Sequence, residues 1–154
     1  MREVVLKTYL EAPADKVWEE LSKPQLLTFV AHPLMKFEPL EPPEFPARWE
    51  QRDYIVSMRF YGIIPVGRQT IRISWPDADG TKRFVRDDGA SALIRHWDHL
   101  ITIEEVDGGT AYTDQVQIEA GLLTPFLALF ARGFYAHRQR RWQQLVRAGF
   151  DYAP

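Results

Sequence analysis

The sequence predicts an α+β fold in which a curved antiparallel sheet of about seven strands closes around one long C-terminal helix. Segments with alternating apolar and polar residues occupy most of the chain up to Glu119. Two short helical stretches follow the first of these segments. From Gly121 to about Phe150 the apolar residues recur every three or four positions, which is typical of a helix. Grouped strands with helices at their ends indicate an α+β fold and not alternating βαβ units.

The N-terminal part of the chain predicts one strand and two short helices. Residues 4–11 alternate, as in a strand with one buried face. Pro13 suits the start of a helix over residues 14–21. A second helix is expected over residues 24–30, because His32-Pro33 disfavours its continuation.

The remaining strands are predicted by alternation, with turn residues between them. They cover residues 34–40, 49–60, 68–75, 82–86, 93–106 and 110–119. Together with the first strand these segments make a sheet of about seven strands, followed by the long helix.

The last two predicted strands meet at Asp107-Gly108-Gly109-Thr110, a strong hairpin signal. If the two glycines form the loop, Ile101 lies opposite Val116, and apolar residues of both strands share a face. In that register His99 lies about four strand residues from Asp114, or roughly 13 Å. The two side chains are then too far apart to form a catalytic pair.

Length and composition exclude several classes of protein. The 154 residues fit one domain spanning 1–154. The absence of cysteine excludes disulfides and thiolate metal sites, and a net charge of −2 gives no basic field for nucleic acid. We see no signal peptide and no integral membrane segment, so a cytoplasmic protein is expected. His96 and His99 fall on opposite strand faces and cannot chelate a metal together, and no cofactor is expected.

Several motifs lie in the order found in one large superfamily. Residues 9–18 resemble its opening pattern, apolar-x-Ala-Pro-x-x-x-Val-Trp, and residues 60–67 resemble a hairpin of one bacterial subgroup. The segments Trp97-Asp98-His99 and Tyr135-Ala136-His137-Arg138 are similar to that subgroup too. On these motifs the chain resembles the START/Bet v 1-like, or SRPBCC, superfamily of polyketide cyclase/dehydrase-like proteins. The resemblance implies a helix-grip fold with a cavity that binds lipids, polyketides or other apolar ligands. Some members are cyclases, dehydratases or hydrolases.

Bulky residues on the inward faces of the sheet and helix are expected to contact the ligand. They could instead form a packed core, but a strongly curved sheet encloses more volume than one helix fills. We therefore favour a cavity. The predicted ligand-binding residues are Tyr54, Met58, Trp75, Trp97, His99, Phe130, Phe134 and Arg141.

One carboxylate is expected inside the protein. Asp114 shares a face with Val116, so it needs a partner once it is buried. Arg138 and Arg141 are the charges within the apolar stripe of the helix, and either could pair with Asp114. We expect a structural ion pair between Asp114 and Arg138, which leaves Arg141 free to bind a ligand carboxylate or phosphate.

The sequence favours binding of a hydrophobic small molecule or lipid as the function. The alternative is a cyclase/dehydratase- or hydrolase-like enzyme, with His99 as base and Arg141 or Tyr54 stabilising an oxyanion. His99 has no partner to orient it in the predicted register, so no catalytic residue is assigned. A third reading rests on the apolar tip Ile63-Ile64-Pro65-Val66, which could be a lid, a membrane contact or a homodimer contact.

Overall fold

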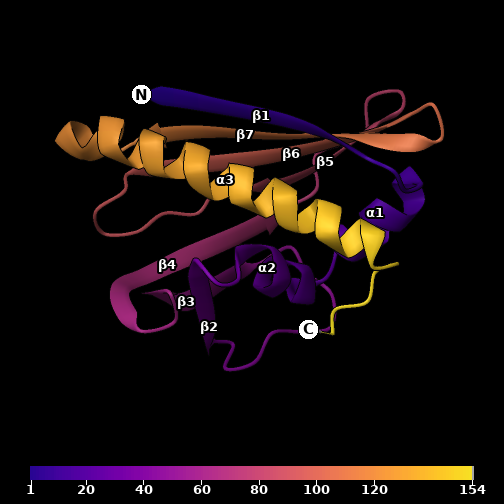
Figure 1. Ribbon diagram of the computed structural model, residues 1–154. Coiled ribbons are helices and arrows are strands. Elements are labelled where there is room, and N and C mark those ends of the chain that lie inside the picture. Colours follow the sequence, from indigo (N-terminus) through magenta and orange to yellow (C-terminus); the bar gives the residue numbers. More distant parts are fainter. Residues whose placement is uncertain (154) are drawn as a thin grey trace.

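The computed structural model describes residues 1–153 and confirms the predicted α+β, helix-grip architecture (Figure 1). Seven antiparallel strands form one sheet in the order β1-β7-β6-β5-β4-β3-β2. The strands are β1 (Arg2–Leu10), β2 (Met35–Glu41), β3 (Asp53–Phe60), β4 (Ile64–Ser74), β5 (Lys82–Asp87), β6 (His96–Val106) and β7 (Gly109–Glu119). The helices are α1 (Ala14–Leu21), α2 (Pro24–Ala31), the short η1 (Gly121–Leu123) and α3 (Thr124–Arg147).

Helix α3 lies across the concave side of the sheet, with α2 packed beside it (Figure 1). It buries a stripe that includes Ala131, Phe134 and Leu145, as its three- and four-residue spacing predicts. The helix ends before Gly149, whose positive φ of 65° stops the regular backbone. The predicted end near Phe150 was therefore three residues too late.

The core consists of two apolar clusters beneath the sheet. One surrounds Tyr54, Tyr112 and Trp142 near the C-terminal end of α3. The other surrounds Val116 and Phe134 near its N-terminal half. The two clusters thus lie toward opposite ends of α3.

The predicted register of the last hairpin was wrong by two residues. The loop consists of Asp107 and Gly108, with positive φ values of 52° and 78°, and Val106 pairs with Gly109. Position 109 in the strand requires a glycine because Tyr9 packs against it; an added Cβ would lie 2.2 Å from the Tyr9 hydroxyl oxygen. A close neighbour, and not turn conformation, explains this second glycine.

The two-residue shift keeps every side chain on its predicted face, because the side-chain period of a strand is two. It changes the partners across the strands. Ile101 lies opposite Asp114, and His99 lies opposite Val116. His99 and Asp114 are therefore diagonal neighbours on the inward face, a distance that side chains can bridge.

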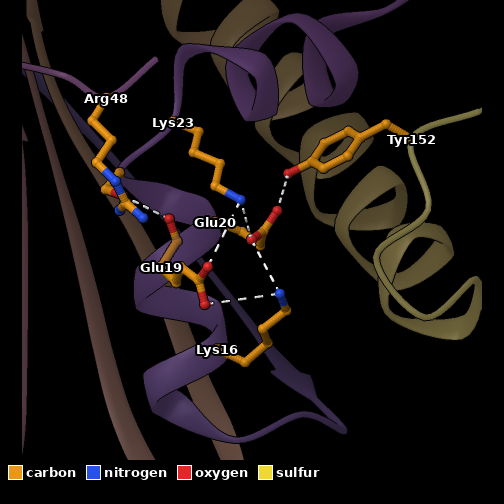
Figure 2. Close-up of polar contacts among 7 residues, drawn as sticks. Lys16, Glu19, Glu20, Lys23, Arg48 and Tyr152 are labelled. Atoms are coloured by element: carbon orange, nitrogen blue, oxygen red, sulfur yellow. Dashed lines mark hydrogen bonds and ion pairs between the residues drawn. The ribbon is translucent and has the colours of Figure 1, made fainter.

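A buried carboxylate anchors the segment that follows α3 (Figure 2). Glu20 is 1% exposed and accepts hydrogen bonds from Lys16 at 3.3 Å, Lys23 at 2.8 Å and the Tyr152 hydroxyl at 2.7 Å. Burial favours the neutral acid, but these hydrogen bonds outweigh it and lower the pKa of Glu20. The charged cluster therefore ties α1 to the C-terminal segment.

Replacing Tyr152 with Phe removes one hydrogen bond to the Glu20 carboxylate and keeps the ring. We expect Tyr152→Phe to lower the free energy of unfolding by about 1.5 kcal/mol, because hydrogen bonds to charged groups contribute more than neutral ones. Urea denaturation checks this. Tyr61→Phe is the matched control, because the Tyr61 side chain is half exposed. The free energy of unfolding of this variant should stay within about 0.5 kcal/mol of that of the unaltered protein. Equal effects of the two changes would contradict the anchoring role of Tyr152.

Candidate functional site

A cavity of about 440 Å³ lies between the concave face of the sheet and α3. Its size falls in the range of small-molecule sites, and most of its wall is apolar. Side chains of β2 to β6, the α1–α2 region and the N-terminal half of α3 contribute to the wall. The polar side chains among them are Lys23, Gln69, Asp87, Ser91, His99, Tyr135 and Arg138.

Five of the eight predicted ligand-binding residues line this cavity. They are Met58, Trp97, His99, Phe130 and Phe134. Alternation on β3 and β6 and helical spacing on α3 were sufficient to bring them together. Whether they bind a ligand remains a prediction.

The other three predicted residues do not line the cavity. Tyr54 is buried against Trp49 and accepts a hydrogen bond from the Glu50 amide at 2.9 Å. Trp75 packs against the same apolar cluster, just beyond the end of β4. Tyr54 and Trp75 pack within the core, so the expectation that they line a cavity is corrected.

Arg141 is also outside the cavity, because α2 holds it. Its guanidinium lies 3.9 Å from the centre of the Phe29 ring, and its Nε donates to the Phe29 carbonyl at 3.0 Å. Its Nη1 donates to Gln144 at 2.8 Å. Arg141 fastens α3 to α2 and does not reach the cavity, contrary to the prediction that it contacts a ligand there.

His99 and Asp114 form a buried pair, which the sequence-based register had excluded. The distance between His99 Nε2 and Asp114 Oδ1 is 2.7 Å, and Asp114 is 1% exposed. The Gln139 amide donates to Asp114 Oδ2 at 3.0 Å, so α3 contributes to the same carboxylate. The Tyr112 hydroxyl approaches Oδ1 at 3.5 Å. A carboxylate thus orients a histidine that lines the cavity.

The environment of His99 favours its neutral form. Burial lowers its pKa, and the opposing effect of Asp114 does not compensate fully. In a neutral His99 that donates to the Asp114 carboxylate, Nε2 carries the ring proton and Nδ1 is left as an acceptor. Within residues 1–153 no hydrogen bond to Nδ1 is formed. A neutral imidazole with a free ring nitrogen can accept a proton or a hydrogen bond from a molecule in the cavity.

The predicted ion pair between Asp114 and Arg138 is not formed. No carboxylate among residues 1–153 lies within 4.0 Å of the Arg138 guanidinium, although that side chain is buried. It lies instead 5.2 Å from the centre of the Tyr135 ring. Both carboxylate oxygens of Asp114 already accept hydrogen bonds, one from His99 and one from Gln139, which explains why Arg138 does not pair with it.

Arg138 is nevertheless charged. Burial works against the guanidinium cation, but the charge of Asp114 and the nearby hydroxyls of Tyr135 and Tyr112 raise its pKa. Its Nε has no hydrogen-bond partner in the described part of the chain. The arginine available to a ligand is thus Arg138, where the sequence favoured Arg141.

Asp87 is a site residue that the sequence analysis missed. It lies directly opposite His99 on β5 and lines the cavity. Its Oδ1 accepts hydrogen bonds from the amides of Arg72 at 2.8 Å and Gly89 at 3.1 Å. Burial raises the pKa of Asp87 to about 7. The only sequence signal was the Asp88-Gly89 turn that ends the strand, which gave no reason to expect a cavity carboxyl.

Exposed apolar residues surround one side of the cavity. Val66, Leu93, Leu123 and Phe130 line it and are also exposed at the surface. They come from the start of β4, the β5–β6 loop and the beginning of α3, which lie at the same side of the molecule (left in Figure 1). This side is therefore the mouth of the cavity.

The predicted apolar tip, Ile63-Ile64-Pro65-Val66, lies at this mouth. Ile63 and Ile64 are exposed, while Val66 also lines the cavity. This position is compatible with a lid and with a docking surface. Within residues 1–153, no helix is long and apolar enough to cross a membrane.

The raised pKa of Asp87 predicts a pH-dependent effect of Asp87→Asn. An unfolded aspartate ionises near pH 4, and the folded protein holds this proton up to about pH 7. Between about pH 4 and pH 7 the unfolded chain has released this proton while the folded protein keeps it, so the free energy of unfolding falls across this range. Asn keeps the Oδ1 acceptor and carries no charge.

We expect Asp87→Asn to raise the free energy of unfolding by about 2 kcal/mol at about pH 8, and by much less at about pH 4.5. Urea denaturation at the two pH values provides the measurement. Asp77→Asn, at an exposed position, is the control. An equal effect of Asp87→Asn at both pH values would show that Asp87 is not destabilised by its surroundings.

Solved structures of low sequence identity share this fold. One is a protein from Mesorhizobium loti, with a TM-score of 0.68 and 13% identity, covering 96% of this chain and 98% of that chain. Another is a START superfamily protein from Mycobacterium smegmatis, with a TM-score of 0.63 and 10% identity, covering 95% and 97% of the two chains. A third is a nucleoside-diphosphate sugar epimerase from Corynebacterium glutamicum, with a TM-score of 0.62 and 19% identity. That match covers 94% of this chain and 29% of the epimerase chain. These likenesses show that the fold is shared.

Sequence comparison gives one assignment. No curated protein matches the chain. A family model described as Domain of unknown function (DUF8410) matches residues 8–146, which is most of the sequence. The chain therefore belongs to the DUF8410 family.

Proposed function

We propose that this protein binds a hydrophobic small molecule or lipid in the cavity between the sheet and α3. The observation that carries the proposal is a cavity of about 440 Å³ with a largely apolar wall. Burial of an apolar ligand there would contribute about 25 cal/mol for each Å² removed from water. A few polar groups at fixed positions would orient the ligand, as is usual in small-molecule sites.

Two further observations support binding. The mouth carries exposed apolar side chains: Leu93 on the β5–β6 loop, Leu123 on η1 and Phe130 in the second turn of α3. Such a rim lets an apolar molecule enter without passing a charged barrier. The likeness to a START superfamily protein is consistent with a ligand-binding fold, although fold alone does not define a ligand.

The binding proposal predicts that filling the cavity abolishes binding. The neutral fluorophore N-phenylnaphthylamine becomes bright in apolar sites and can be titrated into the protein. We expect saturable binding by the unaltered chain and at least about tenfold weaker binding by Leu127→Trp, because Leu127 lines the cavity.

Leu129→Trp is the matched control for this titration. Leu129 lies two residues further along α3, is 72% exposed and does not line the cavity, so binding should be unchanged. Native mass spectrometry of gently purified protein adds the identity of any molecule retained. If the fluorophore does not bind, or binds equally to both variants, the cavity is not the binding site.

A cyclase/dehydratase- or hydrolase-like enzyme is the second candidate function. The pair formed by His99 and Asp114 favours it, because a carboxylate that orients a neutral histidine is typical of general-base sites. Tyr54 and Arg141 lie outside the cavity, so the oxyanion role would pass to Arg138 or Tyr135.

His99→Gln separates the two functions. Gln keeps a polar group near Asp114 but cannot act as a base at neutral pH. If the protein hydrolyses esters of apolar acids, we expect His99→Gln to lower the rate by about 10²-fold or more while fluorophore binding persists. Hydrolysis by the unaltered chain that equals hydrolysis by His99→Gln would contradict this mechanism.

A further inference from the structure

We propose that the bound ligand is an amphiphile with one carboxylate group, and that Arg138 binds this carboxylate inside the cavity. The inference rests on the proposed binding function and specifies the chemical class of the ligand.

The first argument is the state of Arg138. Its side chain lines the cavity with only 7% of its surface exposed, and no carboxylate among residues 1–153 lies within ion-pair distance. Its Nε makes no hydrogen bond within the same residues. Buried charged groups are normally paired, and an unpaired buried polar group is costly. A guanidinium in this state is available to an anion that enters the cavity.

The second argument is that Asp114 does not satisfy Arg138. His99 and Gln139 already donate to the two oxygens of Asp114. Asp114 stabilises the cation through its charge but does not occupy its donors. Arg141, by contrast, donates to Phe29 and Gln144 outside the cavity. Of these two arginines in the helix stripe, Arg138 lines the cavity and Arg141 does not.

A second donor lies beside Arg138. Tyr135 lines the cavity, and its hydroxyl oxygen accepts a hydrogen bond from Trp97 Nε1 at 3.2 Å. The hydroxyl proton is therefore left to donate to a ligand, and burial keeps the phenol protonated by raising its pKa. A ligand carboxylate next to Arg138 could therefore accept hydrogen bonds from the charged guanidinium and from the neutral Tyr135 hydroxyl.

The charge balance favours a carboxylate over a phosphate. Lys23 is the other cation in the cavity wall, and it donates to Glu20 at 2.8 Å (Figure 2). A single guanidinium balances the one charge of a carboxylate, whereas a phosphate monoester carries close to two negative charges at neutral pH. The remaining wall suits the hydrocarbon part of the ligand.

Asp87 makes this binding depend on pH. Its carboxyl lines the same cavity, and its charge and that of Arg138 interact. The other ionisable groups around it are Asp88 just past the end of β5, Arg72 on β4, His99 on β6 and Tyr135 on α3. When Asp87 loses its proton it repels a ligand carboxylate and competes for Arg138. Affinity for the carboxylate should therefore rise as the pH falls from about 8.5 to about 6.5.

The test compares decanoate with decanol, which have the same carbon chain and differ in the charged group. Each displaces N-phenylnaphthylamine, which is neutral, from the full chain. We expect decanoate to bind at least about tenfold more tightly than decanol, and Arg138→Met to reduce this preference to about one. Arg141→Met is the matched control on the same helix and should keep the preference. Arg138→Lys keeps the charge and should retain part of it.

The pH arm uses Asp87→Asn, for which decanoate affinity should be nearly constant between about pH 6.5 and 8.5, while decanol affinity is constant for every variant. If the fluorophore and both decyl compounds fail to bind, the proposed function fails. If they bind and the unaltered chain does not prefer decanoate, the function stands and the role of Arg138 is wrong. This second outcome needs no variant, so poor folding of Arg138→Met would not obscure it. A preference for decyl phosphate over decanoate would reject the carboxylate assignment.

Discussion

The buried carboxylate of Asp114 is the interaction on which the site depends. It lies on β7, accepts from His99 on β6, and accepts from Gln139 on α3. One aspartate thus joins two neighbouring strands to the helix that covers them. It fixes the orientation of the imidazole, and its charge keeps the guanidinium of Arg138 ionised in a buried position. An apolar residue at this position could pack as well, but it would leave the polar side of the cavity without its counter-charge.

The fold could be predicted from the sequence because it depends on periodicity. Alternation identified all seven strands, and the change of period after Glu119 identified α3. Because alternation also sets the faces, the inward positions of Trp97 and His99 followed directly. The cross-strand partners depend on the hairpin loop, and there the prediction chose Gly108-Gly109 where the structure uses Asp107-Gly108. A two-residue shift in strand pairing leaves every side chain on the same face, so alternation cannot reveal it. The shift nevertheless decides whether His99 can contact Asp114.

The rest of the site depends on packing that a single sequence does not contain. Asp87 belongs to the cavity because β5 pairs with β6, while its sequence surroundings are typical of a turn. Arg138 and Arg141 both fit the helix stripe, but only the position of α2 decides between them. The ring and carbonyl of Phe29 hold Arg141, which leaves Arg138 on the cavity side. The sequence placed Tyr54 and Trp75 on the correct face of the sheet, but both pack in the core and do not line the cavity. Curvature and helix position therefore separate core from cavity wall.

The polar residues that line the cavity are compatible with ligand binding as well as with catalysis. His99, Asp87 and Arg138 all line the cavity; the surroundings of His99 lower its pKa and favour its neutral form, whereas Asp87 has a pKa of about 7. The carboxylate of Asp114 orients the His99 ring, an arrangement that a simple carrier does not require. A buried charge that lacks a close partner destabilises the folded state, and Arg138 forms no ion pair within residues 1–153, so an anion in the cavity would relieve this cost. A catalytic role would have to place a reacting bond near His99 Nδ1 while Arg138 holds the acid group. Binding of the carboxylate is thus the step that both functions share.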